Sequence, residues 1–120
     1  MMTTSKSKND CVVVSLSNYF GLEYAEVVKL LQAKGWIDKG VGVYYATYMS
    51  VIIDLLGRPP IIRKPRRGAD KLTGLALVGK YRRYQHLTVI VDGNIFDTNG
   101  EVVPLIQYRA KGWKVNEILF

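Results

Sequence analysis

The sequence predicts an α+β fold in which N-terminal helices pack against a C-terminal antiparallel sheet. Apolar residues recur at helical spacing in the first half of the chain, whereas the second half consists of short apolar segments separated by Gly and Asn turns. Helices followed by strands are typical of an α+β domain. Because 120 residues suffice for one compact core but not for two, we expect a single domain over residues 9–120, preceded by a mobile polar tail over residues 1–8.

The first expected helix is CVVVSLSNYF, residues 11–20, which is apolar on nearly every face and therefore suits a short helix enclosed by the core. Its β-branched valines leave a strand as the alternative. Asn9 or Asp10 can act as the N-cap, and Gly21 is a natural end.

The next two expected helices are also followed by glycine. EYAEVVKLLQAKGW, residues 23–36, has an apolar stripe opposite basic and polar residues, and Gly35 supplies the stop. A third helix is expected over residues 43–56, because Gly57 and then two prolines forbid its continuation.

Four strands are expected, within LTGLALVGKYRRY, HLTVIVDG, NIFDTNG and GWKVNEILF. Asp92-Gly93 is the best hairpin signal, because a two-residue turn needs residues that tolerate positive φ. This turn pairs Thr88 with Asp97. His86 and Asp97 then project from one face as diagonal neighbours with backbones roughly 7–8 Å apart, unless a bulge breaks the parity.

The single cysteine, Cys11, opens the first expected helix. Unpaired backbone N–H groups and the positive end of the dipole stabilise a thiolate there, so a nucleophile is one interpretation and a small buried side chain is the other. A nucleophilic cysteine needs a base, and the only histidine is His86. Asp97 beside the imidazole would fix its tautomer, and Asn99 shares the same face as an alternative orienting group.

This chain order, with cysteine opening a helix, histidine on a strand and aspartate after the next turn, resembles the papain-like cysteine peptidase superfamily. The resemblance is carried by NDCVVVSLSNYFGLEYAEVVKLLQAKG, residues 9–35, and HLTVIVDGNIFDT, residues 86–98. It is nearest to small bacteriophage-encoded members and to bacteriocin-leader-processing peptidases. It implies a papain-like fold in which Cys11 is the nucleophile, His86 the general base and acid, and Asp97 the orienting residue.

The chain departs from that family where a Gln usually precedes the cysteine and completes the oxyanion hole. The corresponding stretch, TTSKSKND, contains no Gln. Asn9 could instead donate its side-chain amide beside the Cys11 N–H. Since one lost donor costs about 2.7–4 kcal/mol of barrier, the role of Asn9 decides between a working enzyme and a weak one.

Positive charge is concentrated in one region of this protein, whose net charge is +7. Residues 58–83 carry nine basic side chains against one acidic side chain, which favours an acidic protein surface or a nucleic acid as partner, although a solvated loop is the plain alternative. The tract IIRKPRRGADK is expected to be an irregular polyanion-binding loop, and without a nucleic-acid-binding motif we expect such binding to be weak. The expected partner-binding residues are Arg63, Lys64, Arg66, Arg67, Lys71, Arg82 and Arg83.

Several classes of protein are disfavoured. No apolar run is long enough to span a bilayer, and the N-terminal MMTTSKSKND lacks the apolar core of a secretory signal. One cysteine and one histidine cannot form an internal disulfide or the usual zinc site. We therefore expect a cytoplasmic protein without a membrane span, a metal or a cofactor.

The resemblance, together with the pattern of Cys11, His86 and Asp97, implies a papain-like thiol hydrolase of phage origin, a peptidase or amidase that acts on a protein or peptide in the host cytoplasm. The basic region would attract an acidic segment of that substrate. The alternative is a catalytically inactive protein on the same scaffold, which captures a host protein or nucleic acid through the basic region.

Overall fold

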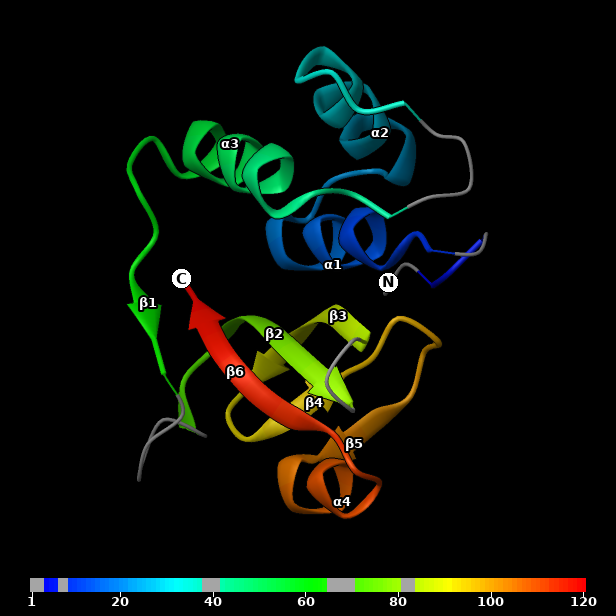
Figure 1. Cartoon of the computed structure of the whole chain (residues 1–120), viewed down its shortest axis with the longest axis vertical. Coiled ribbons are helices and arrows are strands. Elements are labelled where there is room, and N and C mark those ends of the chain that lie inside the picture. The colour runs from blue at the N-terminus through cyan, green and yellow to red at the C-terminus, as the bar shows by residue number, and fades with distance from the viewer. Residues whose placement is uncertain (1–3, 7–8, 38–41, 65–70, 81–83) are drawn as a thin grey trace.

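The computed structural model of the chain describes residues 4–6, 9–37, 42–64, 71–80 and 84–120. Within these residues, three helices form a layer on one side of a six-stranded sheet and a short fourth helix lies at the opposite side (Figure 1). The helices are α1 (Cys11–Phe20), α2 (Tyr24–Ala33), α3 (Tyr45–Leu56) and α4 (Leu105–Ala110). The strands are β1 (Ile62–Arg63), β2 (Gly74–Lys80), β3 (Tyr84–Val91), β4 (Asn94–Phe96), β5 (Val102–Pro104) and β6 (Lys114–Leu119).

The strands follow the order β1-β6-β2-β3-β4-β5, and every neighbouring pair is antiparallel. The long central strands β2 and β3 form a hairpin. The C-terminal strand β6 lies between β1 and β2 and pairs with both. The expected α+β class, with helices preceding an antiparallel sheet, is therefore confirmed.

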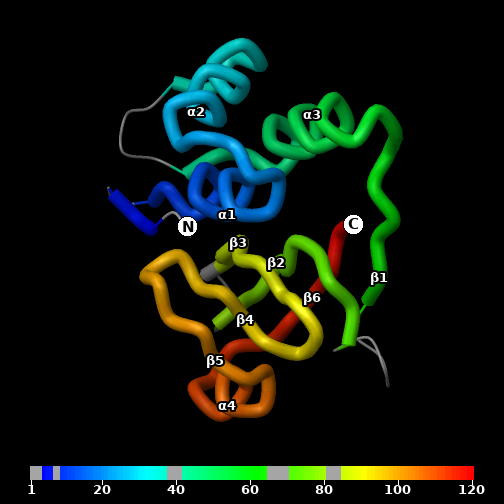
Figure 2. The backbone as a smooth tube through the Cα atoms, turned by 180° about the vertical axis from the view of Figure 1, so that it is seen from behind, coloured from blue at the N-terminus to red at the C-terminus, as the bar shows by residue number. Residues whose placement is uncertain are grey.

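α1 lies between the sheet and the other two N-terminal helices, as both views of the backbone show (Figures 1 and 2). Its Val13, Val14 and Leu16 side chains are fully buried. Burial of such a side chain contributes about 1.5–3 kcal/mol, which exceeds the small penalty of a β-branched residue in a helix. The helical interpretation of residues 11–20 is thus confirmed over the strand, and the helix ends at Gly21 in the left-handed conformation.

α2 and α3 also end where the sequence predicts. α2 buries Val27 and Leu31 from its apolar stripe. α3 begins at Tyr45, two residues after the expected start, and Gly57 closes it with a φ of 71°. At this φ a side chain would be strained, which is the reason for glycine.

The sheet is covered on both faces because its alternating residues belong to two separate cores. Leu75 and Leu77 of β2 face α1 together with residues of α2 and α3. Ala76 and Val78 of the same strand face the opposite way and pack with Tyr108 of α4. α4 therefore closes the face that the first three helices leave uncovered.

Three short elements were not expected from the sequence: β1, β5 and α4. β1 lies in the tract that we expected to be an irregular loop, and this expectation is wrong for Ile62–Arg63, which pairs with β6. The edge of β6 supplies its hydrogen-bonding partner, and no local pattern reveals such a partner. The rest of that tract includes residues 65–70, which lie outside the described residues.

Residues 4–6 lie within the expected N-terminal tail, and hydrogen bonds join Ser5 and Lys6 to the folded chain. The Ser5 N–H donates to the Thr98 carbonyl at 2.8 Å, and the Ser5 hydroxyl donates to Asp10 at 2.5 Å. Residues 1–3 and 7–8 of the expected tail lie outside the described residues. In the part of the chain that the structure describes, no helix combines the length and apolarity needed to cross a membrane.

Candidate active site

α1 carries Cys11 at its first position and packs across β3. Ser15, one turn after Cys11, donates a buried hydrogen bond from Oγ to the Leu87 carbonyl at 2.7 Å. Leu87 is the neighbour of His86, so this bond holds the helix against the strand close to both candidate residues. Sequence reasoning missed Ser15, although a serine within a buried apolar helix must find an acceptor and is itself a signal.

The β3–β4 hairpin has the register that the sequence predicts. Val91 pairs with Asn94 across the two-residue turn Asp92-Gly93. Both turn residues have positive φ, 47° and 81°, as a turn of this kind requires. His86 and Asp97 are thereby brought to one face of the hairpin, and their side chains make contact.

Asp97 orients His86 through a short hydrogen bond. Nε2 of His86 lies 2.7 Å from Oδ1 of Asp97, and the two side chains are only 11% and 15% exposed. The backbone N–H of Thr98 donates to the same carboxylate oxygen at 2.8 Å and holds it in place. Because Nε2 bonds the carboxylate, Nδ1 is the ring nitrogen that remains for the thiol.

The pKa values of this pair are shifted towards the charged forms. Burial alone would lower the pKa of His86, but the hydrogen bonds with Asp97 and Cys11, together with their charges, raise it from 6.5 to about 9. Burial would raise the pKa of Asp97, but the hydrogen bond and charge of His86 lower it. The imidazole therefore holds a proton at neutral pH, and the sulfur of Cys11 is close enough to influence it.

Aromatic rings pack against His86 from the α4 side. The ring centroid of Trp113 lies 5.5 Å from that of His86. Trp113 in turn stacks on Tyr108 at 5.4 Å, and the Lys80 ammonium lies 5.7 Å from the indole centroid. This packing restricts rotation of the imidazole and keeps it directed at its partners. The contact between Trp113 and His86 joins segments far apart in the chain, so no local sequence pattern reveals it.

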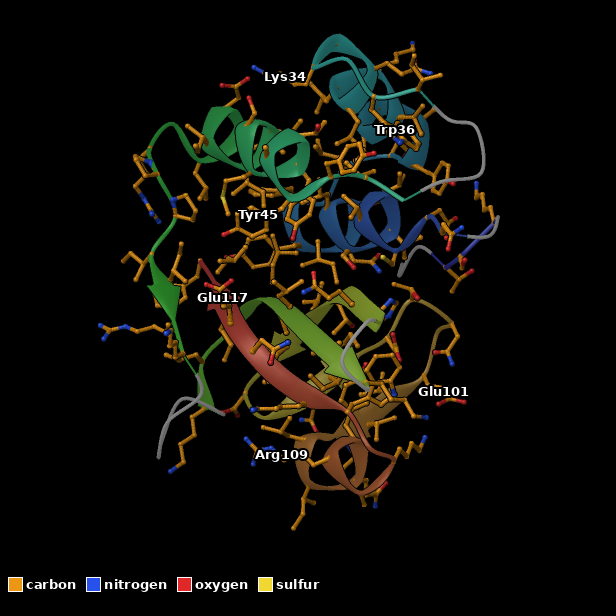
Figure 3. All side chains as sticks on the ribbon, in the orientation of Figure 1. Lys34, Trp36, Tyr45, Glu101, Arg109 and Glu117 are labelled. Carbon is orange, nitrogen blue, oxygen red and sulfur yellow. The ribbon has the colours of Figure 1, made fainter. Side chains whose placement is uncertain are left out.

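A cavity of about 330 Å³ lies beside Cys11 and His86. Cys11 is half-buried and is one of the residues that line this cavity. Tyr45 and Tyr48 of α3 line the same cavity, and Figure 3 shows Tyr45 at the boundary between the helices and the sheet. Burial, followed by the charges of Tyr45 and Cys11, raises the pKa of Tyr48. A cavity of this size accommodates a side chain or a short peptide segment.

Asn9, the expected oxyanion-hole residue, lines the cavity next to Cys11 and has a φ of 66°. The Cys11 N–H belongs to the first turn of α1, where N–H groups have no acceptor within the helix. Asp10 occupies the N-cap position, but the expected side-chain cap is absent. Its carboxylate accepts hydrogen bonds from Ser5, Lys6 and Tyr24 instead. Asn9 and Cys11, the two residues that the oxyanion hypothesis requires, both line the cavity.

Asn99, the alternative orienting residue, has another partner. Its Oδ1 accepts a hydrogen bond from the Glu101 N–H at 3.0 Å in an exposed turn. The same turn returns the Gly100 N–H to the Asp97 carbonyl at 3.0 Å. Asn99 thus shapes the turn, and Asp97 contacts the imidazole.

The expected partner-binding residues that the structure describes do not line this cavity. Arg63 and Lys64 are exposed at β1, which is the edge of the sheet three strands away from β3 (Figure 1). Lys71 is exposed between β1 and β2. The remaining expected partner-binding residues, Arg66, Arg67, Arg82 and Arg83, lie outside the described residues.

Gln85 also lines the cavity beside His86, although sequence reasoning gave it no role.

Among the residues that the structure describes, no group of three or more His, Cys, Asp and Glu side chains is placed to hold a metal ion. A scan against protein-family models found no match for this chain, and neither did searches of curated proteins and of solved structures.

Proposed function

We propose that the protein is a cysteine hydrolase, a peptidase or amidase, that uses Cys11 as nucleophile, His86 as general base and acid, and Asp97 as orienting residue. The observation that carries the proposal is that Cys11 and His86 line one cavity, with Cys11 contributing to the raised pKa of His86, while Nε2 of His86 bonds Asp97. Nucleophile, base and orienting group in this order are the parts that covalent acyl transfer requires.

In the acylation step, the Cys11 sulfur attacks the carbonyl carbon of an amide as a thiolate. A carbon–sulfur bond forms, the carbon–nitrogen bond breaks, and the imidazolium of His86 gives its proton to the leaving amine. The raised pKa of His86 supports this role, because the ring already carries that proton at neutral pH. The Asp97 carboxylate stabilises the imidazolium before the transfer.

In the deacylation step, water attacks the thioester. Neutral His86 accepts a proton from this water, the carbon–sulfur bond breaks, and the acid product leaves with Cys11 regenerated. In both steps the carbonyl oxygen gains negative charge, for which the Cys11 N–H and the Asn9 amide are the candidate donors. The cavity beside them provides room for the acyl group.

We propose further that the scaffold is papain-like and that the protein comes from a phage, acting in the cytoplasm of its host. The order of the three residues along the chain supports the papain-like assignment, as does the position of Cys11 at the start of a helix packed on the histidine strand. The protein or peptide substrate would enter at the cavity, where the aromatic side chains of α3 meet the polar groups around Asn9.

Alkylation by iodoacetamide tests the nucleophile directly, because the chain has one cysteine. We expect native Cys11 to react at pH 7 several-fold faster than free cysteine, since His86 places a positive charge where the thiolate forms. A library of peptides from a digested proteome tests hydrolysis, with new termini identified by mass spectrometry. The wild-type protein should generate such termini and Cys11→Ala should not.

A slow native reaction that becomes fast only on unfolding would contradict the proposal, because it would show an ordinary buried thiol. Equal peptide cleavage by wild type and Cys11→Ala would also overturn it, because the activity would then come from elsewhere. A circular dichroism spectrum of Cys11→Ala that matches wild type provides the control for folding.

A further inference from the structure

Asp10, which directly precedes the candidate nucleophile, is buried, with 4% of its surface exposed. An aspartate at an N-cap normally accepts hydrogen bonds from the first N–H groups of its own helix. Here it accepts from the Ser5 hydroxyl at 2.5 Å, the Lys6 N–H at 2.8 Å and the Tyr24 hydroxyl at 2.9 Å. The carboxylate immediately before Cys11 therefore holds residues 4–6 and α2, and its burial is compensated by these donors.

Ser5 connects this carboxylate to the sheet side of the site. Its hydroxyl donates to Asp10, while its backbone N–H donates to the Thr98 carbonyl at 2.8 Å. Thr98 follows Asp97 in the chain and bonds its carboxylate through the backbone N–H. A continuous path of covalent and hydrogen bonds thus runs from Cys11 through Asp10, Ser5 and Thr98 to Asp97.

The arrangement in space agrees with this path. In both backbone views, the N-terminal segment lies beside α1 and above the loop that follows β4 (Figures 1 and 2). Ser5, Asp10 and Thr98 all line the cavity that contains Cys11 and His86. The Lys6 ammonium lies 5.0 Å from the centroid of the Tyr24 ring, which adds a second contact between the segment and α2.

We propose that Ser5 and Asp10 are positioning residues: through their shared hydrogen bond, residues 4–6 hold the Cys11 end of α1 against the His86–Asp97 pair. Their role as positioning residues for catalysis rests on the proposed hydrolase function, whereas the placement of Cys11 against His86 can be tested without any substrate. α1 and the β3–β4 hairpin are far apart in the chain, so residues 4–6 link them by hydrogen bonds and not by a short covalent connection.

Three serine variants separate the positioning role of Ser5 from general stabilisation of the fold. Ser5 is exposed, so Ser5→Ala removes the hydroxyl without leaving a hole in the core. Ser5→Thr keeps the hydroxyl and serves as the rescue. Ser17→Ala is the matched control, because it also removes a serine hydroxyl bond, to the Leu22 carbonyl at 2.5 Å, but at the far end of the same helix.

Two readouts need no assumption about the substrate, since the chain has one cysteine and one histidine. The first is the alkylation rate of Cys11 by iodoacetamide between pH 5 and pH 9, and the second is the NMR titration of the His86 ring. In Ser5→Ala we expect alkylation at pH 7 to slow by about 10-fold, the factor that corresponds to a lost hydrogen bond to a charged group. The titration midpoint of His86 should fall, because the contribution of Cys11 weakens.

Ser5→Thr should restore both readouts to wild-type values, and Ser17→Ala should lower the melting temperature without moving either. Asp10→Asn, which weakens the same bonds from the other side, should change both readouts in the same direction as Ser5→Ala. If Ser5→Ala and Asp10→Asn only lower the melting temperature and leave alkylation and the His86 titration at wild-type values, the positioning role is wrong.

Failure of the hydrolase proposal gives a different result. In that case wild-type Cys11 reacts no faster than free cysteine and no peptide is cleaved. The His86 titration of Ser5→Ala then still reports whether residues 4–6 hold Cys11 against the ring, because that measurement depends only on their proximity.

Discussion

Two regions of the sheet, the β3–β4 hairpin and the β1 edge, differ in how their charged side chains are held. At the hairpin, His86 and Asp97 are nearly buried and bonded to each other, and Trp113 packs against His86. At the β1 edge, Arg63 and Lys64 are exposed. The exposed residues of the β1 edge carry net positive charge. Among the described residues, however, the resolved pKa shifts belong to His86 and Asp97 and to Tyr45 and Tyr48 of α3.

The comparison shows that chemistry depends on burial and register more than on the amount of charge. A charge in water is screened by solvent and ions, so exposed lysines and arginines interact weakly with their neighbours. Charged groups that are largely shielded from water interact more strongly, because the effective dielectric constant around them is lower. One largely buried histidine and one largely buried aspartate can therefore influence each other more than many exposed basic residues do. The predictions below test this contrast, starting with the largest expected effect.

Removal of the imidazole should have the largest effect. For His86→Ala we expect peptide hydrolysis to fall by about 10²–10⁴-fold, the range that a general acid and base contributes. Alkylation of Cys11 at pH 7 should slow in parallel, since the positive charge beside the sulfur is lost. Rates are measured with the peptide library and with iodoacetamide. Hydrolysis that persists at the wild-type rate in His86→Ala would show that His86 is not the general base and acid.

Asp97→Asn should have an intermediate effect, with a characteristic pH dependence. Loss of a charge-assisted hydrogen bond of about 1.5–3 kcal/mol should slow hydrolysis by about 10- to 150-fold. The pKa of His86 lies above its ordinary value, so its contribution to the free energy of unfolding is complete below pH 6.5 and is lost as pH rises through about 9. The pKa of Asp97 is lowered, so its contribution is present above pH 3.8 and is lost on acidification.

The stability difference between wild type and Asp97→Asn should therefore be largest between about pH 5 and pH 6.5 and should shrink towards pH 10. Chemical denaturation at pH 6 and pH 10 measures it. Asn99→Ala is the matched control, because it removes an amide from the same turn that bonds Glu101 and not His86. A stability difference that does not vary with pH would show that Asp97 acts without its partner.

Removal of charge at the β1 edge should have the smallest effect on the site. For the double variant Arg63→Gln and Lys64→Gln, we expect unchanged alkylation of Cys11 and a change of less than about 0.5 kcal/mol in the free energy of unfolding. If this edge binds polyanions, the salt dependence of binding to single-stranded DNA should weaken by about one unit of slope for each lost contact.

Lys29→Gln with Lys114→Gln removes the same amount of charge from other exposed positions and serves as the control. Equal loss of DNA binding in both double variants would assign the effect to net charge alone. Slower alkylation of Cys11 in the β1 variant would instead show that the β1 edge is coupled to the candidate site.

Much of the fold follows from local signals in the sequence. The period of apolar residues and the glycines that follow them locate α1, α2 and α3, because a left-handed terminal residue and an apolar stripe are properties of a few neighbouring positions. The Asp92-Gly93 turn fixes the register of β3 and β4, so the shared face of His86 and Asp97 also follows locally. β1 and β5 are too short to produce such a pattern and depend on the strands beside them.

The sequence by itself determined the class of fold and the candidate residues Cys11, His86 and Asp97, since each follows from residue type and spacing. Only the tertiary structure decided that α1 lies across β3 with Cys11 beside the imidazole, that Ser15 bonds Leu87, and that Ser5 joins the two sides of the site. It also placed the basic edge away from the cavity. These contacts join residues far apart in the chain, and they form because the cores on both sides of the sheet must be buried together, which no short stretch of sequence specifies.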